Sequence, residues 1–473
     1  MNSSGDLRLR AHSFAALAAA GLLAGCVHYQ PEPIHPVETA AALEARSLEA
    51  PGLAALLQAN HRSESATWDF ESLTLAALYW HPNLDVARAE WASTIAGETT
   101  AAGRPNPTLS AGPEYNFNAA SGLTPWIANL NLDWPVETAG KRGKRIARAE
   151  TLSTAARLRL AVAAWQVRSR LRAALLEHAA ARNREQLLLA QVTVQEKIVE
   201  RLESKIRAGA ATRLEASPAR IALAKVRVEA GAARSASAEA RARVAEAIGV
   251  PAAALAGVEL RFPLQVPASG DLASSEARRA ALLGRADVLA ALADYAAAEA
   301  TLRLEIAKQY PDVHLGTGYQ YDQGENKWNI GISSELPLLN RNQGPIAEAT
   351  ARRAEFAARF IAVQAKAIAE IDRALAAWHA AQEQLSGLAP LEAALRQQAE
   401  AVAAQAKAGA AEPLDVLAAE AELSASALAE FDARLRAVQA LGLLEDALQR
   451  PFSALKTIEQ GRDLQATLKE KQP

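Results

Sequence analysis

The sequence repeats itself at an offset of about two hundred residues, and this duplication limits the possible folds more than any other feature. Residues 81–84 correspond to 285–288, and residues 207–211 correspond to 407–411. Self-similarity at one constant offset indicates a structural repeat, in which each copy has the same order of helices and strands. The duplication therefore predicts one body built from two similar halves instead of two or three unrelated domains.

The N-terminus is expected to be an export signal that ends in a lipidation site. Arg8 and Arg10 precede a short apolar run from Phe14 to Leu23, which leads into Leu-Ala-Gly-Cys26. This tetrad resembles the lipobox of bacterial lipoproteins, so Cys26 is expected to become the acylated first residue. The non-acidic residue after Cys26 resembles an outer-membrane address. The alternative is a chance run of small residues before a buried cysteine.

Composition and breaker residues divide the chain into six segments. They are the signal peptide 1–25, a tether with a short helix 26–70, the first repeat 71–250, a connector 251–275, the second repeat 276–450 and a tail 451–473. Within the repeats, periodicity and Gly or Pro stops predict helices over 71–103, 142–207, 213–248, 276–309, 344–406 and from 413 to about 449. The strand pairs are predicted at 108–118 with 126–134 and at 312–322 with 328–336.

The predicted helix lengths favour a tall helical wall. At 1.5 Å per residue the helix 142–207 would be roughly 95 Å long, and the helices 71–103 and 213–248 would each be about half that length. Two half-length helices stacked end to end would match one full-length helix. Outside the export signal no stretch of eighteen residues is apolar and uncharged, so no transmembrane helix is predicted. The chain could cross a membrane only as closed strands.

The predicted strands alternate between apolar and polar residues, with aromatic residues concentrated near their ends. This pattern is typical of lipid-facing barrel strands with interfacial aromatics, although a soluble amphipathic hairpin would alternate too. Pro113 removes a ladder donor, and we expect a bulge there. The polar set, expected to line a lumen, is Glu114, Asn116, Asn129, Asn131, Asp133, His314, Gln320, Asp322, Asn329 and Glu335.

Four strands are too few to close a barrel, so several chains are expected to combine. Two chains would supply eight strands, and a barrel of about eight strands is filled by its own side chains. Three chains would supply twelve strands and leave a water-filled lumen, which predicts a homotrimer. Because the expected lumen is mildly acidic, cations should be tolerated.

The strand boundaries resemble those of the TolC-like outer-membrane efflux protein family over nearly the whole mature chain. The resemblance rests on the segments 106–109 and 311–313 before the strands, and on 134–142 and 336–344 after them. The last of these, Leu-Pro-Leu-Leu-Asn-Arg-Asn-Gln-Gly, resembles the CzcC-like branch for heavy-metal cation efflux. The resemblance implies a mainly α fold with a small β part: a trimeric twelve-stranded outer-membrane β-barrel on a long periplasmic α-helical barrel. The implied partners are a periplasmic adaptor, an inner-membrane resistance-nodulation-division pump and outer-membrane lipid.

The same resemblance assigns sites to the two repeated glycine motifs, which would form periplasmic tips that dock the adaptor. The residues concerned are Arg207, Gly209, Thr212, Leu214, Lys407, Gly409 and Leu414. Asp415 matches one inward aspartate of the family's closed pore. The family's second acidic position is Ala418 here, so Glu412 or Glu420 would substitute. The alternative is that Asp415 and Glu215 merely favour the N-terminal ends of their helices.

The remaining charged and histidine residues predict no chemistry. A basic cluster, Lys141, Arg142, Lys144 and Arg145, is expected to contact membrane phosphate or to be a solvated helix start, and a net charge of −2 gives no reason to expect nucleic acid. Eight histidines lack ligand spacing, so no metal or cofactor is expected. Without a phosphate loop or a nucleophile–base pair, the chain is not expected to be an enzyme.

The sequence therefore predicts a passive exit duct of a tripartite efflux system, with heavy-metal cations as the substrate. Two other readings stay open. One is an outer duct for multidrug efflux or type I protein secretion. The other, from a different class, is a periplasmic coiled-coil lipoprotein that acts as a scaffold.

Overall fold

The computed structural model describes residues 28–62, 67–266 and 275–451. Cys26, the predicted signal 1–25 and nearly all of the predicted tail lie outside the described residues. The helix α2 (Pro36–Glu44) belongs to one unit, which ends at Arg46, and every other described element belongs to a second unit that begins at Ser47. The second unit carries both repeats.

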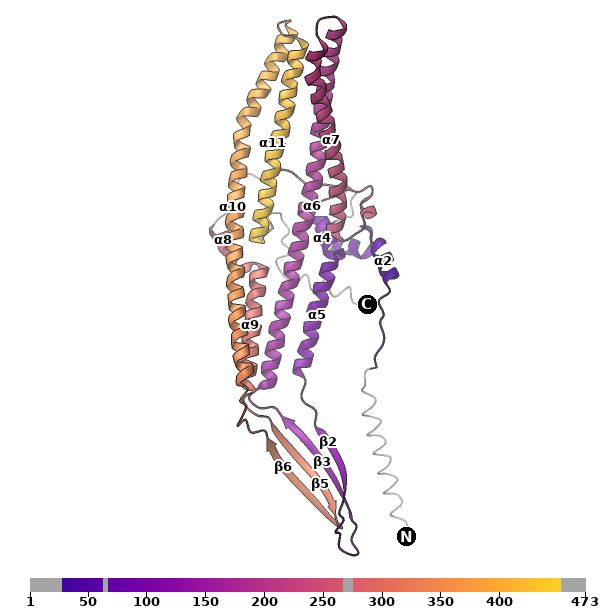
Figure 1. The fold of residues 1–473 in the computed structure, drawn as a ribbon, viewed down its shortest axis with the longest axis vertical. Helices are drawn as coiled ribbons and strands as arrows, with labels where there is room; N and C mark the ends of the chain where they lie inside the picture. Colours follow the sequence, from indigo (N-terminus) through magenta and orange to yellow (C-terminus); the bar gives the residue numbers. More distant parts are fainter. Residues whose placement is uncertain (1–27, 63–66, 267–274, 452–473) are drawn as a thin grey trace. The chain divides into compact units, whose positions relative to one another are not determined.

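The two repeats have the same order of elements, as Figure 1 shows. After α3 (Pro51–Ala59), the first repeat consists of α4 (Phe70–Trp80), α5 (Pro82–Ala102), β2 (Thr108–Tyr115), β3 (Trp126–Val136), α6 (Lys141–Arg207) and α7 (Arg213–Ile248). The second repeat consists of α8 (Ser275–Gly284), α9 (Ala286–Ala307), β5 (Val313–Asp322), β6 (Glu325–Ser334), α10 (Gln343–Lys407) and α11 (Pro413–Leu448). Between them, the short helix η1 (Ala252–Leu255) precedes β4 (Glu259–Leu260), which pairs in parallel with β1 (Thr67–Trp68).

The stacking predicted from helix lengths is confirmed. The helix α6 contacts α5 along the half nearer the strands and α7 along the other half, while α10 contacts α9 and then α11 (Figure 1). Alanine dominates these contacts, and its small side chain lets helices approach closely. No helix among the described residues is both long enough and apolar enough to cross a membrane.

Two of the predicted helices were wrong, because each is broken in two. The helix predicted over 71–103 stops at Trp80 and restarts at Pro82, since proline has no N–H and disfavours helical geometry at His81, whose φ and ψ are −70° and 122°. The helix predicted over 276–309 breaks at Arg285, with φ and ψ of −58° and 132°. No proline is present there; the local signal was Gly284, which ends α8 just before the break and was not recognised as a helix stop.

The four longer strands form one antiparallel sheet in the order β2-β3-β5-β6. Their bounds differ from the predictions: β2 ends at Tyr115 instead of 118, and β6 runs from Glu325 to Ser334 instead of 328–336. The bulge expected at Pro113 is also wrong, because Pro113 pairs with Ala128 in an uninterrupted register. The strand β2 is an edge of the sheet, where a missing N–H donor is tolerated.

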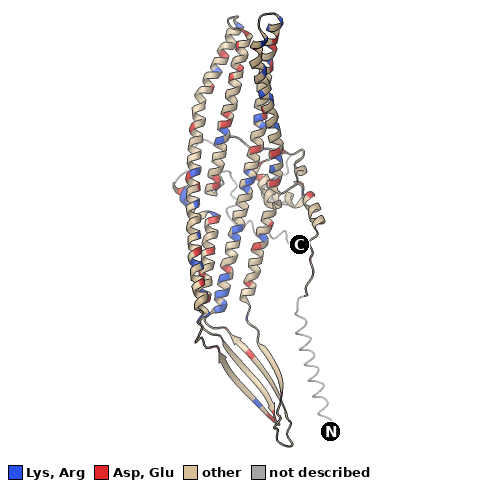
Figure 2. Ribbon diagram, viewed as in Figure 1, with Lys and Arg blue, Asp and Glu red and all other residues tan. Residues whose placement is uncertain are grey.

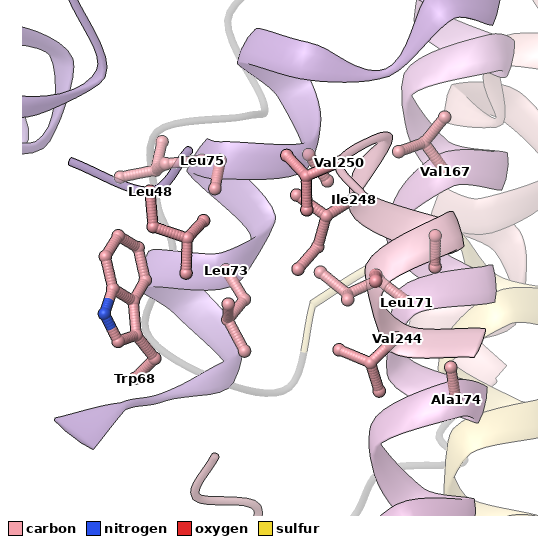
Figure 3. Close-up of a cluster of buried hydrophobic side chains, with 14 of the residues drawn as sticks. Leu48, Trp68, Leu73, Leu75, Val167, Leu171, Ala174, Val244, Ile248 and Val250 are labelled. Atoms are coloured by element: carbon pink, nitrogen blue, oxygen red, sulfur yellow. The ribbon is translucent and has the colours of Figure 1, made fainter. Parts of the chain in front are cut away.

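The larger hydrophobic core lies in the first repeat, where α3, α4, α6 and α7 meet. Leu73, Leu171 and Ile248 are fully buried there, and Figure 3 shows their side chains converging. A smaller core around Ile371, Trp378 and Leu444 joins α10 to α11. Between the repeats, an ionic cluster connects α6 with α11: Arg168 and Arg172 both contact Glu445. Because burial lowers the pKa of Arg168 and Glu445 opposes that shift, the guanidinium depends on this carboxylate.

Candidate channel surface and helix tips

The register of the sheet gives it one polar and one apolar face. Directly opposed residues share a face, so the pairs Asn131–Gly318 and Asn129–Gln320 continue the polar face from β3 to β5. The predicted lumen residues that the strands place on this face are Glu114, Asn129, Asn131, Asp133, His314, Gln320, Asp322 and Asn329. The other face is apolar and exposed, with Trp328 78% and Ile330 86% exposed. Figure 2 shows that charged residues are few in the strands and frequent along the helices.

Most charged side chains on the polar face have a partner on the same face. Asn129 Nδ2 donates to Glu114 Oε1 at 2.8 Å, and His314 Nδ1 lies 2.8 Å from Asp133 Oδ2. The polar face is thus a connected hydrogen-bonding surface. It presents carboxylates, amides and one imidazole to whatever it encloses.

Glu325, Lys327 and Gly318 of the polar face are missing from the predicted lumen set, and Glu325 pairs with Asp322. Lys327 Nζ donates to Asp322 Oδ2 at 2.7 Å, but the strand was predicted to begin one residue later. The missed signal was Gln323-Gly324, a two-residue turn with φ of 53° and 92° that places the start of β6 at Glu325. Gly318 is needed for close packing on this face: a Cβ there would clash with the side-chain oxygens of Asn131 and Asn329, which close over its backbone.

Two predicted lumen residues lie outside the strands. Glu335 follows the last residue of β6, and Asn116 follows the last residue of β2. Neither holds a paired position, so the register does not assign either to the polar face. They were predicted to line the lumen because the alternation of polar and apolar residues was continued past the last residues of β2 and β6.

The basic cluster at the start of α6 bonds to the chain's own groups, and its contact with membrane phosphate stays a prediction. Lys141 Nζ donates to Asp312 Oδ1 at 2.8 Å, and Arg142 Nε donates to the carbonyl of Ala102 at 2.8 Å. Arg145 pairs with Glu137, and Lys144 donates to the carbonyl of Ala139. These bonds join the end of β3 to the start of β5 and the end of α5.

The pKa of the Asp312 carboxyl reflects this junction. Burial alone would raise that pKa, but the hydrogen bonds from Lys141 and from the backbone N–H of Thr138 outweigh burial and hold it below its ordinary value. The ionised form of Asp312 is therefore the form that the fold stabilises.

The two predicted tips lie together at the end of the helices away from the strands (Figure 1). Gly209 and Gly409 turn the chain there with φ of 72° and 77°, the left-handed region that glycine adopts most easily. Lys205 Nζ donates to Glu412 Oε2 at 2.5 Å, which joins the end of α6 to the start of α11. Both tips are therefore at the same level along the helices.

The other predicted tip residues flank these glycines. Arg207 and Lys407 are the last residues of α6 and α10, and Thr212 is the N-cap of α7. Leu214 is 82% exposed, whereas its counterpart Leu414 is half-buried. The two tips thus have the same backbone plan but expose different side chains.

The predicted gate residues lie on the first turns of α11. Asp415 Oδ2 accepts from the backbone N–H of Glu412 at 2.8 Å in a reciprocal capping box, and Thr212 with Glu215 forms the same motif at the first tip. Glu420 is exposed one to two turns further on. Within a single chain Asp415 therefore caps its helix, which is the alternative that the sequence left open.

In the part of the chain that the structure describes, no group of three or more His, Cys, Asp or Glu side chains could hold a metal ion. The chemistry of this molecule lies in its surfaces: a two-faced sheet continued by long helices that end in paired tips. Such a combination defines a channel-wall protein of the transport class.

The model of the outer membrane efflux protein family matches residues 75–250 and 277–448, well over half of the sequence. The chain belongs to the outer membrane efflux protein family. No curated protein matches the sequence.

Solved structures share the fold. The outer membrane protein VceC from Vibrio cholerae is 24% identical, with a TM-score of 0.66, over 81% of this chain and 97% of its own. The CmeC outer membrane channel from Campylobacter jejuni is 16% identical, with a TM-score of 0.66, over 84% of this chain and 89% of its own. CusC, described for its transmembrane channel formation, is 18% identical, with a TM-score of 0.64, over 81% of this chain and 92% of its own.

Family membership confirms the general prediction from the sequence. The chain is an outer-membrane efflux duct with a periplasmic helical extension, and its role is transport and not catalysis. The family match does not specify the CzcC-like branch, so it leaves both metals and drugs open as substrates.

Proposed function

We propose that three copies of this chain close a twelve-stranded barrel that conducts cations, heavy-metal cations in particular, from a periplasmic adaptor and an inner-membrane resistance-nodulation-division pump to the exterior. The observation that carries the proposal is the four-stranded sheet with a polar face, an exposed apolar face and two unpaired edges, β2 and β6. Unpaired edges inside a membrane must be satisfied by another strand. Three copies supply twelve strands and a lumen wider than that of an eight-stranded barrel.

The helices support the same closure, because the free edges lie on the same two sides along the whole unit. Near the strands the contacts run in the order α5-α6-α9-α10, and near the tips they run α7-α6-α11-α10. One side therefore ends in β2, α5 and α7, and the other side ends in β6 and α10. Joining unlike edges of identical copies head to tail makes a closed ring when the rotation closes.

The charge of the polar face supports cations as the substrate. Glu114, Asp133 and Asp322 contribute carboxylates, whereas Lys327 is the basic residue of the face. Rings of carboxylates lining a pore favour cations. Since Cys26 is the sole cysteine, a thiolate relay for soft metals is absent, and selection among metals would belong to the pump.

The proposal also assigns an adaptor-docking site and a lipid anchor. The tip residues from Arg207 to Leu214 and from Lys407 to Leu414 would dock the adaptor. Acylated Cys26 would attach the protein to the membrane by a lipid anchor, in addition to the membrane-embedded barrel. Multidrug efflux or type I protein secretion is the second candidate, and the same fold would serve it.

Mass measurement of the detergent-extracted protein tests the assembly, and a growth assay tests the substrate. We expect a mass of three chains; two chains would contradict the proposal, because eight strands leave no open lumen. Cells that lose the protein should become sensitive to heavy-metal cations and not to drugs. Sensitivity to drugs alone would favour the second candidate.

Asp415 is proposed to hold the closed tip in addition to capping α11. Asp415→Ala should raise the resting conductance in a planar bilayer. Glu215→Ala is the matched control, because it removes the same capping-box partner at the first tip. Equal effects of the two changes would reduce Asp415 to a helix cap.

A further inference from the structure

The outward face of α7 near the tip carries large apolar side chains at a spacing of seven. Leu214, Ile221 and Val228 are 82%, 66% and 72% exposed, while the opposite face of α7 packs on α6 through residues such as Leu223 and Val226. A repeat of seven residues is the signature of a coiled-coil seam. This helix therefore has two seams, one occupied by α6 and one bare.

The positions three residues after each of these large residues are small. Ser217, Ala224 and Gly231 follow each large residue by three positions, which completes an a/d pattern along the bare seam. The corresponding helix of the second repeat, α11, has no such bare face: Leu414 and Leu428 are half-buried, and Leu428 packs beside Leu188 and Val226. The bare seam thus marks the first repeat's edge of the wall, where the row of helices ends.

The helix at the other edge, α10, exposes small residues at the same spacing. Gly387, Ala394 and Ala401 are seven residues apart and exposed, and a Cβ built on Gly387 would meet open space. Leu391, 52% exposed, lies on the same face between the first two. The side of α10 toward α11 carries Trp378, in the core shared with α11, and Gln384, whose Oε1 accepts from Arg436 of α11 at 3.0 Å. Between Leu391 and the tip, the small residues Ala394 and Ala401 leave a groove into which large side chains of another helix can insert.

The two faces match in height. The salt bridge between Lys205 and Glu412 puts both tips at one level, so α7 and α10 can be measured from the same end. Ile221 lies eight residues from the start of α7, and Ala401 lies six residues from the end of α10. At 1.5 Å per residue they differ in height by roughly 3 Å.

The charges at the lower end of the two faces are complementary. Arg234 is exposed on α7 and Glu383 is exposed on α10. Measured from the tips, the two residues differ in height by three residues, or roughly 5 Å. An acidic groove edge opposite a basic seam edge favours pairing in this register.

We infer that the bare seam of α7 packs into the small-residue groove of α10 in the next copy, with Ile221 inserted beside Ala401. The inference rests on the proposed closure of three copies, and it names the joint between copies at the level of the tips. A second copy is the occupant because α7 and α10 are the opposite ends of the helix row. The helices would run antiparallel, as every neighbouring pair in the row does.

Disulfide trapping tests this joint directly. The full-length Ile221→Cys, Ala401→Cys double variant, oxidised in detergent, should give covalent dimers and trimers that a reductant dissolves. The matched control is the Ile221→Cys, Gly387→Cys variant. Its second cysteine lies roughly 18 Å from residue 221 along the helix axis, beyond the reach of a disulfide. Each single variant controls for cross-links through Cys26.

The mass of each variant before oxidation separates the two claims. A trimer that links through 221 and 401 but not through 221 and 387 is the expected result. A trimer that fails to link through 221 and 401, or links equally through both pairs, overturns the joint and leaves the duct intact. A monomer would overturn the proposed closure together with the joint.

Discussion

The two repeats interrupt the same helix by different means. In the first repeat the break between α4 and α5 has a proline, Pro82, and a glycine, Gly249, packed against it. In the second repeat the break between α8 and α9 has Ala286 and Gln449 at the equivalent positions; Gly284 ends α8, and Arg285 and Gln449 hold the bend. The duplicated topology therefore fixes where the chain bends, while the chemistry that holds the bend differs between copies.

At the first break, the backbone at the end of α7 packs against the backbone between α4 and α5. Gly249 has φ of 88°, and a Cβ there would lie 2.9 Å from both the carbonyl oxygen of Trp80 and the Cα of His81. Only glycine fits this conformation and this approach without strain. The surrounding side chains belong to the larger hydrophobic core.

The second break is filled by polar side chains. Arg285 is 4% exposed and donates to Asp287 Oδ2 at 2.7 Å, to Glu370 Oε2 at 2.8 Å and to the carbonyl of Ala447 at 2.7 Å. Gln449 Oε1 accepts from the N–H of Ala286 at 2.8 Å. The repeats thus show that a buried polar network and a tight apolar packing can support the same bend.

The largest expected effect comes from removing the arginine. Arg285→Met leaves Asp287 without its cation and Glu370 with Lys366 alone, and should destabilise the protein by about 3–5 kcal/mol, the usual cost of breaking a buried ion pair. His81→Met at the equivalent position should cost about 1 kcal/mol, since one hydrogen bond to Asn83 N–H is lost. Thermal unfolding of the detergent-solubilised protein measures both. Equal losses would show that the two bends do not differ in chemistry.

A smaller difference is expected at the glycine. Gly249→Ala should cost about 2–4 kcal/mol, because the new methyl group meets backbone atoms at positive φ. Gln449→Ala, which ends in the same residue at the equivalent position, should cost about 1 kcal/mol for its hydrogen bond. The comparison uses the same unfolding measurement. A loss of stability below about 1 kcal/mol in Gly249→Ala would mean that α4 and α7 can shift apart.

Acid should weaken the sheet junctions of both repeats. Asp312 lies just before β5, and its pKa is lowered because hydrogen bonds from Lys141 and Thr138 outweigh burial; the pKa of Glu305 is lowered because bonds from Lys308 and Asn342 outweigh burial. Since the folded pKa lies below the unfolded one, each contribution is complete above the ordinary carboxyl pKa and is lost as pH falls through the folded value. Melting curves across acidic pH measure the slope.

Substitution assigns that slope to its residues. Asp312→Asn should flatten the acid dependence at the first junction, and Glu305→Gln should flatten it at the second, each by less than the effect of Arg285→Met. An unchanged slope in both variants would place the acid sensitivity elsewhere.

The smallest effect is expected at Pro82. Because the second repeat bends without a proline, Pro82→Ala should leave the break between α4 and α5 in place and change stability by less than about 1 kcal/mol. Spin labels at Glu71 and Glu98 would report the bend as an unchanged distance. A longer distance would mean that the two helices merge and that proline alone makes the bend.

The sequence predicts the repeated order of elements and the two-faced strands because hydrophobic period and length are local signals. The break at Arg285 escaped prediction because Gly284 was not recognised as a helix stop, and because the partners of Arg285, Glu370 and Ala447, lie far away in the sequence. Lys327 escaped because the strand limit was placed after a turn that was not recognised. The capping role of Asp415 could be anticipated from its position at a helix start, whereas a pore-closing role depends on neighbouring copies.

The central claim is that the polar sheet face lines a cation-conducting lumen made by three copies. Single-channel recording of the purified trimer in a planar bilayer, with different salt concentrations on the two sides, tests it most directly. We expect discrete conductance with a reversal potential that favours cations, and a weaker preference in the Asp133→Asn variant. A trimer that stays silent even when Asp415→Ala opens the tip, or that favours anions, would contradict the account.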